Sequence, residues 1–359
     1  MVMTIDSYRL LAERLDALPN GFPPTTSGIE LRLLAKLFSP EEAELASHLR
    51  LTLETADEIA VRMGDDPERL KKLLKGMARR GLITAGKGTN GIGFKLMPFV
   101  VGIYEMQGET LDAELAELFE QYFSEGFKDI LGVQPSVHRV IPVNESIQAG
   151  IEVHPYESAA QIVEKASAWG VIDCICRKQK ALIGEPCPHP IDVCMTLSTT
   201  PGVYDNSTFV HALTKEEAHA TLKRAAEAGL VHSVSNNQKD VWYICNCCTC
   251  SCGVLRGISE LGVLNAVAHS SFRNSVAEDL CILCGDCIDH CQFHAISLED
   301  KIVIDILHCT GCGVCVLSCP EGALRLIQRE TGDIPEIPEN EQMWMRARAN
   351  ARKIDLNLL

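Results

Sequence analysis

Cysteine is absent from the first 173 residues of this 359-residue chain, although the whole chain contains 17. The boundary separates a half without thiol ligands from a half that is rich in them. The chain also has only three Trp and no run of 18 or more uncharged apolar residues, so no transmembrane helix is expected. Its length allows two or three domains, each with its own core.

The first eleven residues lack the features of a secretory signal. They contain Asp6 and Arg9, and they have no basic start, long apolar stretch or small-residue cleavage site. We therefore expect a cytoplasmic protein. The glycines from Gly86 to Gly93 lack dinucleotide-binding spacing, and the chain has no P-loop, so a nucleotide-driven oxidoreductase is disfavoured.

Charge is distributed unevenly. The first 100 residues hold 14 basic and 13 acidic side chains, a net charge of +1. The remaining residues therefore carry −16, which gives the total net charge of −15. An acidic surface repels nucleic acid phosphates and suits partner proteins with basic docking patches.

The spacing of the cysteines argues against a disulfide framework. They fall into four tight groups, which brings thiolates together around a metal instead of pairing distant strands. Two of these groups, Cys281–Cys291 and Cys309–Cys319, are C-x2-C-x2-C-x3-C runs. Each cysteine of the first run recurs 28 residues later, and Ala295 recurs as Ala323, so the segment is an internal repeat with expected pseudo-twofold symmetry. Each half should supply a cluster loop and a short helix, with a strand near residues 301–306.

These two runs resemble those of bacterial dicluster ferredoxins, which hold two [4Fe-4S] clusters. In that family the fourth cysteine of each run ligates the other cluster. The resemblance therefore implies that one cluster is held by Cys281, Cys284, Cys287 and Cys319, and the other by Cys309, Cys312, Cys315 and Cys291. The first run departs from the pattern, because Gln292 follows its last cysteine where the second run has Pro320.

Nine further cysteines form the two central groups, and we predict that they bind metal. They are Cys174, Cys176, Cys187, Cys194, Cys245, Cys247, Cys248, Cys250 and Cys252. Two four-ligand sites leave one thiol spare, unless one composite site draws on both groups. Alternate residues of an extended segment point to opposite sides, so the five thiols of residues 245–252 should not all face one metal. We expect the two groups to meet in space.

One or two additional Fe–S clusters are the favoured cofactors of this central region, and zinc and a redox-active thiol site are the alternatives. His189 is either a ligand or a solvent-facing side chain in a proline-rich turn, and we expect the second. Arg177 is either a salt-bridge partner or a charge beside a cluster. The stretch of residues 140–328, with Cys174-Ile-Cys176-Arg177 ahead of the two runs, resembles multi-cluster ferredoxin-like proteins of anaerobic bacteria and archaea.

Residues 29–97 read as a winged helix, and their order and spacing resemble bacterial winged-helix regulators. Capping boxes at Ser39 and Thr55 and the Asp66-Pro67 pair start three helices, the last of which ends at Gly81. A glycine-rich wing should precede a strand at residues 94–97. The third helix is basic, so DNA is an alternative partner, which the weak net charge disfavours.

A second pattern of this kind begins with a capping box at Thr214. It predicts a helix to about Ala228 and a hairpin that leads into Cys245, as a scaffold for the central metal site. Residues 111–127 are amphipathic, and residues 335–359 form either a docking helix or a frayed end.

The predicted fold class is α+β, with a winged-helix-like N-terminal domain, a central helix-hairpin cysteine-rich domain and a ferredoxin-like dicluster domain. The expected boundaries are 1–105 for the first, 106–145 for a helical linker, 146–270 for the second, 271–330 for the third and 331–359 for a tail.

The favoured function is an iron–sulfur electron-transfer protein that carries low-potential electrons to a partner reductase. A redox-sensing winged-helix DNA-binding regulator and an oxidoreductase with a catalytic central metal site are the alternatives. The sequence identifies no catalytic residue and no individual redox partner. A homodimer remains an alternative to a monomer.

Overall fold

The computed structural model describes residues 2–147 and 153–356. The chain is a mixed α+β protein, as expected, and it divides into two compact units. The first unit comprises Met1–Ile130 and Arg348–Leu359, and the second comprises Leu131–Ala347. Within the described ranges, no helix is both long and apolar enough to cross a membrane.

The first unit is mostly helical. Its helices are α1 (Val2–Asp16), α2 (Ile29–Leu37), α3 (Pro40–Ser47), α4 (Ala56–Met63), α5 (Pro67–Arg79) and α6 (Ala113–Tyr122). A π-helical turn at Phe123–Phe127 leads into α7 (Lys128–Leu131). The last residue of α7, Leu131, is the first residue of the second unit. The strands β1 (Glu54–Thr55), β2 (Thr84–Gly88) and β3 (Gly91–Lys95) form an antiparallel sheet in the order β1-β3-β2.

The predicted helix starts of this unit are confirmed. Ser39 and Thr55 both form complete capping boxes, and Asp66 caps α5 with Pro67 at its first position. The helix ends two residues before Gly81, whose φ of 70° is the left-handed conformation that glycine adopts without strain. One boundary differs from the expectation, because β3 begins at Gly91 instead of residue 94. The glycine-rich stretch itself forms the hairpin ladder.

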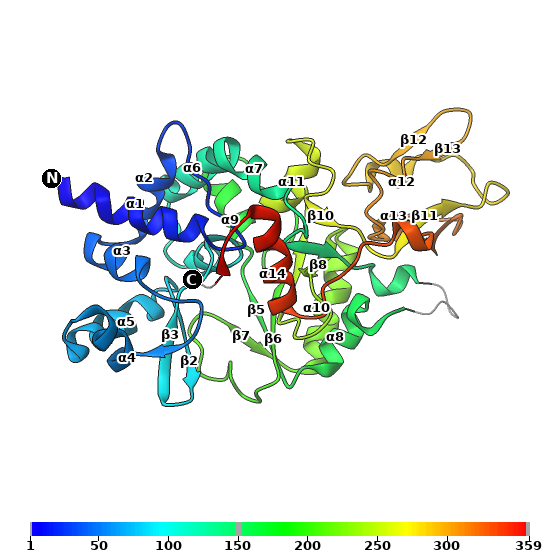
Figure 1. The fold of residues 1–359 in the computed structure, drawn as a ribbon. Helices are drawn as coiled ribbons and strands as arrows, with labels where there is room; N and C mark the ends of the chain where they lie inside the picture. The colour runs from blue at the N-terminus through cyan, green and yellow to red at the C-terminus, as the bar shows by residue number, and fades with distance from the viewer. Residues whose placement is uncertain (1, 148–152, 357–359) are drawn as a thin grey trace. The chain divides into compact units, whose positions relative to one another are not determined.

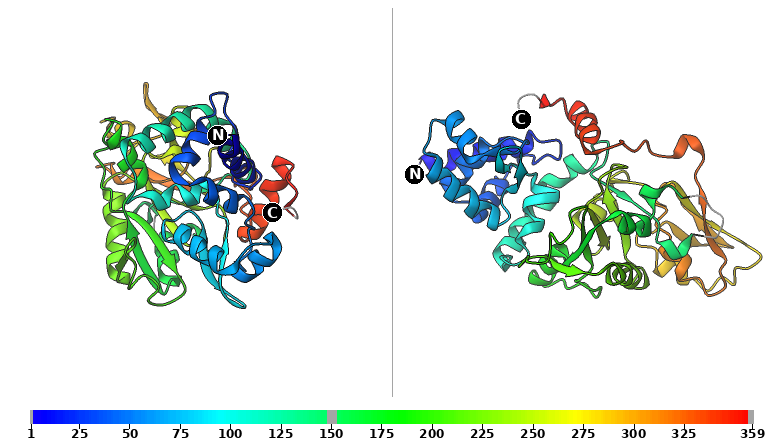
Figure 2. Two further views of the ribbon diagram at one scale, coloured as in Figure 1. Left: turned by 90° about the vertical axis from the view of Figure 1, so that its left-hand side faces the viewer. Right: turned by 90° about the horizontal axis from the view of Figure 1, so that it is seen from below.

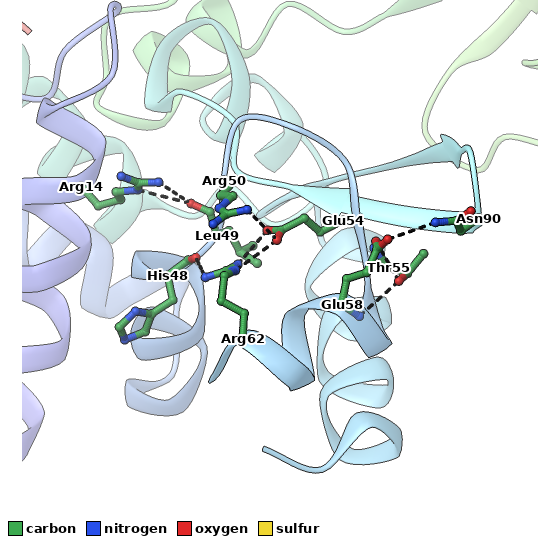
Figure 3. Close-up of polar contacts among 9 residues, drawn as sticks. All are labelled: Arg14, His48, Leu49, Arg50, Glu54, Thr55, Glu58, Arg62 and Asn90. Carbon is green, nitrogen blue, oxygen red and sulfur yellow. Dashed lines mark hydrogen bonds and ion pairs between the residues drawn. The ribbon is translucent and has the colours of Figure 1, made fainter. Parts of the chain in front are cut away.

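A polar network ties β1 to the helices around it (Figure 3). Glu54 is 9% exposed and accepts hydrogen bonds from Arg62 at 3.0 and 2.7 Å and from Arg50 at 3.4 Å. Arg62 also donates to the carbonyl of His48 at 2.9 Å. The carboxylate of Glu54 therefore anchors both the loop before β1 and helix α4.

The second unit is built on a seven-stranded sheet. Its strand order is β10-β4-β8-β9-β6-β5-β7, and all pairs are antiparallel except β10 with β4. The strands are β4 (His138–Val140), β5 (Ala168–Ile172), β6 (Cys194–Ser198), β7 (His211–Leu213), β8 (Val231–Ser235), β9 (Tyr243–Cys247) and β10 (Val267–Ala268). The helices between them are α8 (Ala159–Lys165), α9 (Ile175–Leu182), α10 (Lys215–Glu227) and α11 (Gly253–Ser259).

Apolar side chains of α8 and α10 bury one part of this sheet. Ile162 and Leu222 pack with Met195, Val234 and Ile244 in one core cluster. The predicted capping box at Thr214 is confirmed. The predicted hairpin is also present as β8 and β9, but β9 extends beyond Cys245 as far as Cys247.

The two cysteine runs lie in the last part of this unit, drawn in yellow to orange (Figures 1 and 2). The elements here are β11 (Phe272–Val276), α12 (Asp286–Asp289), β12 (Ile296–Leu298), β13 (Ile302–Ile304), α13 (Val314–Leu317) and β14 (Leu324–Gln328). β11 pairs with β14 and β12 with β13, both antiparallel. Each run thus enters one short helix, as the repeat predicted.

The tail folds into helix α14 (Glu341–Arg352). In the second unit, the indole of Trp344 donates to the carbonyl of Ser136 at 2.9 Å. In the first unit, Arg348 is 0% exposed and donates to the carbonyls of Pro19 and Ile130, both at 2.8 Å. The tail is therefore an ordered helix over these residues, and its two ends belong to different units.

Candidate metal centres

The two cluster loops have the same backbone geometry. Gly285 and Gly313 precede α12 and α13 in the left-handed conformation, with φ of 87° and 78°. This conformation turns each loop sharply after its second cysteine. The surroundings differ, because a Cβ on Gly313 would meet Ser146 Oγ at 2.1 Å, whereas a Cβ on Gly285 would meet nothing within 4 Å.

The structure gathers the eight cysteines into two groups of four. Cys281, Cys284, Cys287 and Cys319 line one cavity. Burial raises the pKa of Cys287, and the nearby charges of the other three thiols raise it further. Burial likewise raises the pKa of Cys315 well above its usual value, with further contributions from Cys312, Cys291 and Cys309.

Each group therefore combines three thiols of one run with the fourth thiol of the other. That donor set fits a [4Fe-4S] cluster held by four thiolates. The raised pKa of Cys287 and of Cys315 shows that four thiolates are unfavourable together unless a positively charged centre lies between them. An iron–sulfur core supplies this and makes reversible one-electron chemistry available at each site.

Backbone amides support the sulfurs symmetrically in the two halves. Ala295 N–H donates to Cys291 Sγ at 3.3 Å, and Ala323 N–H donates to Cys319 Sγ at 3.2 Å, at equivalent positions of the 28-residue repeat. Asn274 adds two donors to the second group alone. Its backbone N–H lies 3.5 Å from Cys309 Sγ, and its side-chain amide lies 3.0 Å from Cys315 Sγ.

The two groups also differ in exposure. Cys284 is exposed, and Ile282 beside it is 61% exposed. Cys287 of the same group is buried, at 7%, so the exposure lies at one corner of this site. None of the four cysteines of the second group is exposed, and Cys309 and Cys315 are each 8% exposed. We call the first group the surface cluster site and the second the buried cluster site. Because exposure and hydrogen bonds to sulfur both tune reduction potentials, the two clusters should not be equivalent.

Six of the nine central thiols form a second assembly, which we call the six-thiol ring. Its members, in order of contact, are Cys194, Cys174, Cys176, Cys252, Cys247 and Cys245. Cys174 interacts with Cys194 and Cys176, and Cys252 interacts with Cys176 and Cys247, so that these thiols shift one another's pKa. Cys245 closes the ring through its interactions with Cys247 and Cys194, and these interactions raise the pKa of those two thiols.

Strand pairing explains how the ring closes. Met195 of β6 lies opposite Ile244 of β9, so the same antiparallel register brings Cys194 beside Cys245. Cys245 and Cys247 then share one face of β9, as the period of two requires. Asn246 between them points the other way, and its side-chain amide donates to the carbonyl of Val193 at 2.6 Å.

Three polar side chains border the ring. His138 is 3% exposed, and its two ring nitrogens have no hydrogen-bond partner among the described residues. Burial lowers the pKa of His138, which favours the neutral imidazole. Ser233 Oγ lies 3.6 Å from Cys247 Sγ. Arg177 is 2% exposed. Burial lowers the pKa of its guanidinium, but the nearby thiols raise it overall, namely Cys174, Cys248, Cys194 and Cys247. These contacts support the interpretation of Arg177 as a charge beside a metal centre.

The other three central thiols meet a histidine outside the ring. Cys187 Sγ lies 3.0 Å from His189 Nδ1, 3.6 Å from Cys248 Sγ and 3.1 Å from Cys250 Sγ. All four ligand atoms are within 4.8 Å of one another. Hydrogen bonds from Cys250 and His189, together with the charge of Arg177, lower the pKa of Cys248 to about 4. Cys248 is therefore a thiolate near neutral pH, the form that binds metals.

Gln292 joins the ferredoxin-type segment to this region. Its side-chain oxygen accepts from the backbone N–H of Thr249 at 2.8 Å, and its side-chain nitrogen donates to the carbonyl of Gly229. Thr249 lies between Cys248 and Cys250, and Gln292 follows Cys291 of the buried cluster site. The departure from proline at this position thus has a structural reason, because a proline side chain makes neither bond.

The expectation that His189 faces solvent is wrong, because its Nδ1 lies 3.0 Å from Cys187 Sγ within the compact set of four ligand atoms. Sequence reasoning noted Gln292 only as a departure from proline, and it left out His138 and Asn274. One signal was available for His189, since Cys187-Pro188-His189 and Cys248-Thr249-Cys250 share the same ligand spacing of two residues. His138 and Asn274 lie far in sequence from the thiols that they border, and Gln292 lies 43 residues from its partner Thr249, so spacing alone contained no signal for their contacts.

Comparisons with known proteins agree on the ferredoxin-type segment. Residues 280–323 match the family of 4Fe-4S dicluster domains. Pyruvate synthase subunit PorD of Methanothermobacter marburgensis is 36% identical over 56 residues, which are 16% of this chain and 67% of that protein. Indolepyruvate oxidoreductase subunit IorA of the same organism is 41% identical over 51 residues, 14% of this chain.

The chain spans only 8% of the length of the IorA subunit, so that likeness concerns the cluster-binding segment alone. No solved structure matches the chain. The dicluster match implies two [4Fe-4S] clusters, in agreement with the two groups of four thiols. The chain belongs to the family of proteins that carry a ferredoxin-type 4Fe-4S dicluster domain.

Proposed function

We propose that this protein moves electrons between a partner oxidoreductase and a metal centre in the six-thiol ring, with the surface cluster next to the partner and the buried cluster next to the ring. The observation that carries the proposal is the contrast between the two cluster sites. One has an exposed cysteine, whereas the other is joined to the cysteine-rich region by backbone hydrogen bonds.

These bonds come from segments that flank the central sheet. Val143 N–H donates to the carbonyl of Cys312 at 2.9 Å, and Ser270 N–H donates to the carbonyl of Thr310 at 3.0 Å. Gln292 adds the bridge to Thr249. Electron transfer needs short, rigid separations between centres, and these contacts hold the buried cluster loop against the central region.

The exposed surface near the first cluster suits a protein partner. Leu280, Ile282 and Leu283 are 49%, 61% and 44% exposed, and they flank Cys281 in the sequence. Exposed carboxylates lie on both sides of these residues in the sequence, Asp279 before them and Asp286 at the start of α12. An apolar centre with an acidic rim favours a partner surface with an apolar centre and a basic rim. The two curated relatives are subunits of oxidoreductases, which supports a partner of that class.

The six-thiol ring is proposed to hold a third iron–sulfur centre. Its thiols contact one another in pairs around a ring, and the described part of the chain has no trio of them that lies within 4.8 Å throughout. A single zinc ion requires all of its ligands in one compact shell. A polynuclear centre fits the ring better, and the guanidinium of Arg177 offsets part of the thiolate charge.

The first unit is proposed to be a winged-helix-like docking element in a cytoplasmic protein. Its order of helices, strand and hairpin supports that interpretation. The DNA-binding alternative is disfavoured, because three of the six basic residues of α5 and its C-cap Arg80 are already paired with acidic groups. The pairs are Arg69 with Glu41 and Asp65, Lys71 with Glu68, and Arg80 with Glu42.

The test uses the full chain, purified and reconstituted without oxygen, and two variants. Wild-type protein should bind about eight irons in the dicluster segment, four for each cluster, and give EPR signals on reduction. Cys284→Ser and Cys312→Ser should each lose about four irons, since each removes a ligand of one cluster.

Rapid mixing with a reduced viologen then tests the order of transfer. Cys284→Ser should slow reduction of the buried cluster, whereas Cys312→Ser should leave reduction of the surface cluster at the wild-type rate. Unchanged reduction of the buried cluster in Cys284→Ser would overturn the order. Zinc alone, with no EPR signal on reduction, would refute electron transfer altogether.

A further inference from the structure

The four groups Cys187, His189, Cys248 and Cys250 form a compact donor set that the electron path does not use. They come from two short segments, the turn before β6 and the loop after β9. Cys187 Sγ lies 3.0 Å from His189 Nδ1, 3.1 Å from Cys250 Sγ and 3.6 Å from Cys248 Sγ. Cys250 Sγ lies 3.8 Å from His189 Nδ1. No pair among the four exceeds 4.8 Å.

We propose that this set binds one Zn²⁺ as a mononuclear tetrahedral site, separate from every iron–sulfur centre. Zinc binds thiolate at about 2.3 Å and imidazole at about 2.0 Å, so the ligand sulfurs of one ion lie about 3.8 Å apart. The separation of 3.6 Å between the Sγ atoms of Cys187 and Cys248 is close to this value, and the Sγ atoms of Cys187 and Cys250 lie somewhat closer, at 3.1 Å. An iron–sulfur cluster places at least two irons and their bridging sulfides among its ligands, which requires thiolates to stand further apart.

The local structure prepares the site. Cys248 is 1% exposed and packs in a small core with Val193, Ala225 and Leu230, and Cys187 packs against the same core. Prolines 186, 188 and 190 restrict the backbone of the turn that carries Cys187 and His189. The ordering entropy of the ligands is therefore largely lost during folding, before the metal binds.

Arg177 completes the charge balance of this site. Three thiolates and a neutral imidazole around Zn²⁺ leave a net charge of −1. The Arg177 guanidinium donates to Cys248 Sγ at 3.5 Å, and it also donates to the carbonyls of Asn246 and Pro190 at 2.8 and 2.9 Å. Arg177 thus contacts one ligand sulfur and the backbone of both segments that carry ligands. Such hydrogen bonds from residues around the ligands hold the ligands of metal sites in position.

The zinc would act as a structural clamp between two iron–sulfur regions. Cys247 belongs to the six-thiol ring and Cys248 to the zinc set, so adjacent residues face different centres. The loop held by zinc also contains Thr249, the hydrogen-bond partner of Gln292. Zinc would therefore fix both the ring and the contact with the buried cluster loop, without taking part in redox chemistry.

Metal analysis of the full-length protein tests the site. Wild-type chain expressed with zinc and iron and purified without oxygen should contain one zinc in addition to its iron. Cys187→Ser and His189→Ala should each lose that zinc and keep the dicluster EPR signal, which also shows that the variant has folded. The matched controls Cys176→Ser, in the ring, and Cys284→Ser, at the surface cluster, should lose iron and keep zinc.

X-ray absorption at the zinc edge of the wild-type protein gives a second test that needs no variant. The expected shell has three sulfurs at about 2.3 Å and one nitrogen at about 2.0 Å. A wild-type protein without zinc, a shell of oxygen and nitrogen, or loss of iron with zinc unchanged in Cys187→Ser would each overturn the proposal. These results are independent of the viologen kinetics, so the clamp and the electron path can fail separately.

Discussion

Leu283 and His294 have left-handed backbone conformations, with φ of 58° and 52°. The residues 28 positions later are Gly311 and Gly322, with φ of 74° and 62°. The cluster loop therefore needs this conformation at the same places in both halves, whichever side chain is present. Side chains with a Cβ are strained there by about 1 kcal/mol or more. The first half of the 28-residue repeat therefore carries this backbone strain at Leu283 and His294, where the second half has glycine.

Gly313→Ala and Gly285→Ala form a matched pair at equivalent positions. We expect Gly313→Ala to abolish the buried cluster, because its Cβ would overlap Ser146 and no small movement of a flexible side chain relieves contacts at 2.1 and 2.6 Å. Gly285→Ala should keep both clusters, because only the left-handed backbone opposes it, at about 1 kcal/mol. Iron content and EPR spectra distinguish the two, and equal loss in both variants would contradict the clash argument.

Gln292 gives a prediction of a different kind, because Gln292→Pro restores the proline that the second run has at this position. The variant should retain both [4Fe-4S] clusters, since no ligand changes. It should lose the bonds to Thr249 and Gly229, which contribute about 1 kcal/mol each. Hydrogen exchange at the amide of Thr249 should therefore become faster. Unchanged exchange there would show that the bridge does not form in solution.

At the scale of elements, helix α4 depends on a nearly buried carboxylate. Arg62→Ala removes two hydrogen bonds to Glu54 and leaves only the longer contact with Arg50 (Figure 3). We expect a local loss of about 1–2 kcal/mol, because a nearly buried carboxylate loses its principal partner. Hydrogen exchange in residues 54–63 should accelerate accordingly.

The neighbouring change Val61→Ala is the control, since Val61 is 85% exposed. It should leave exchange in α4 within a factor of about two, because exposed positions away from special contacts change stability by less than about 0.5 kcal/mol. If both variants accelerate exchange equally, the Glu54 network does not stabilise the helix.

At the scale of the whole molecule, the chain returns to its first unit through the end of α14. Arg348 is 0% exposed and satisfies two carbonyl groups of that unit, Pro19 and Ile130. Arg348→Lys keeps a positive charge but lacks the planar fork of donors. We expect it to destabilise the first unit by about 2–3 kcal/mol, since buried acceptors lose their partners.

Arg346→Lys on the same helix is the matched control, because Arg346 is exposed. Thermal unfolding followed by circular dichroism should show a lower first transition for Arg348→Lys alone. Iron content should stay at the wild-type level in both variants, since all 17 cysteines lie in the second unit. Loss of iron in Arg348→Lys would indicate that the two units do not unfold separately.

Much of the local structure was predictable because its causes are local. The capping boxes at Ser39, Thr55 and Thr214 each lie within four residues, and all three are present. Boundaries were less predictable where glycine was interpreted as loop. In β3 the cross-strand hydrogen bonds decide the start of the strand, and these depend on β2.

The two C-x2-C-x2-C-x3-C runs by themselves determined that the chain carries a dicluster module, because cluster ligands within a run are fixed by spacing along the backbone. The division of the nine central thiols was decided only in three dimensions. Pairing of β6 with β9 brings Cys194 to Cys245, and the turn at Cys187 and His189 meets the loop at Cys248 from 61 residues away. The six-thiol ring and the three-thiol set with His189 therefore depend on strand register, which spacing along the chain does not encode.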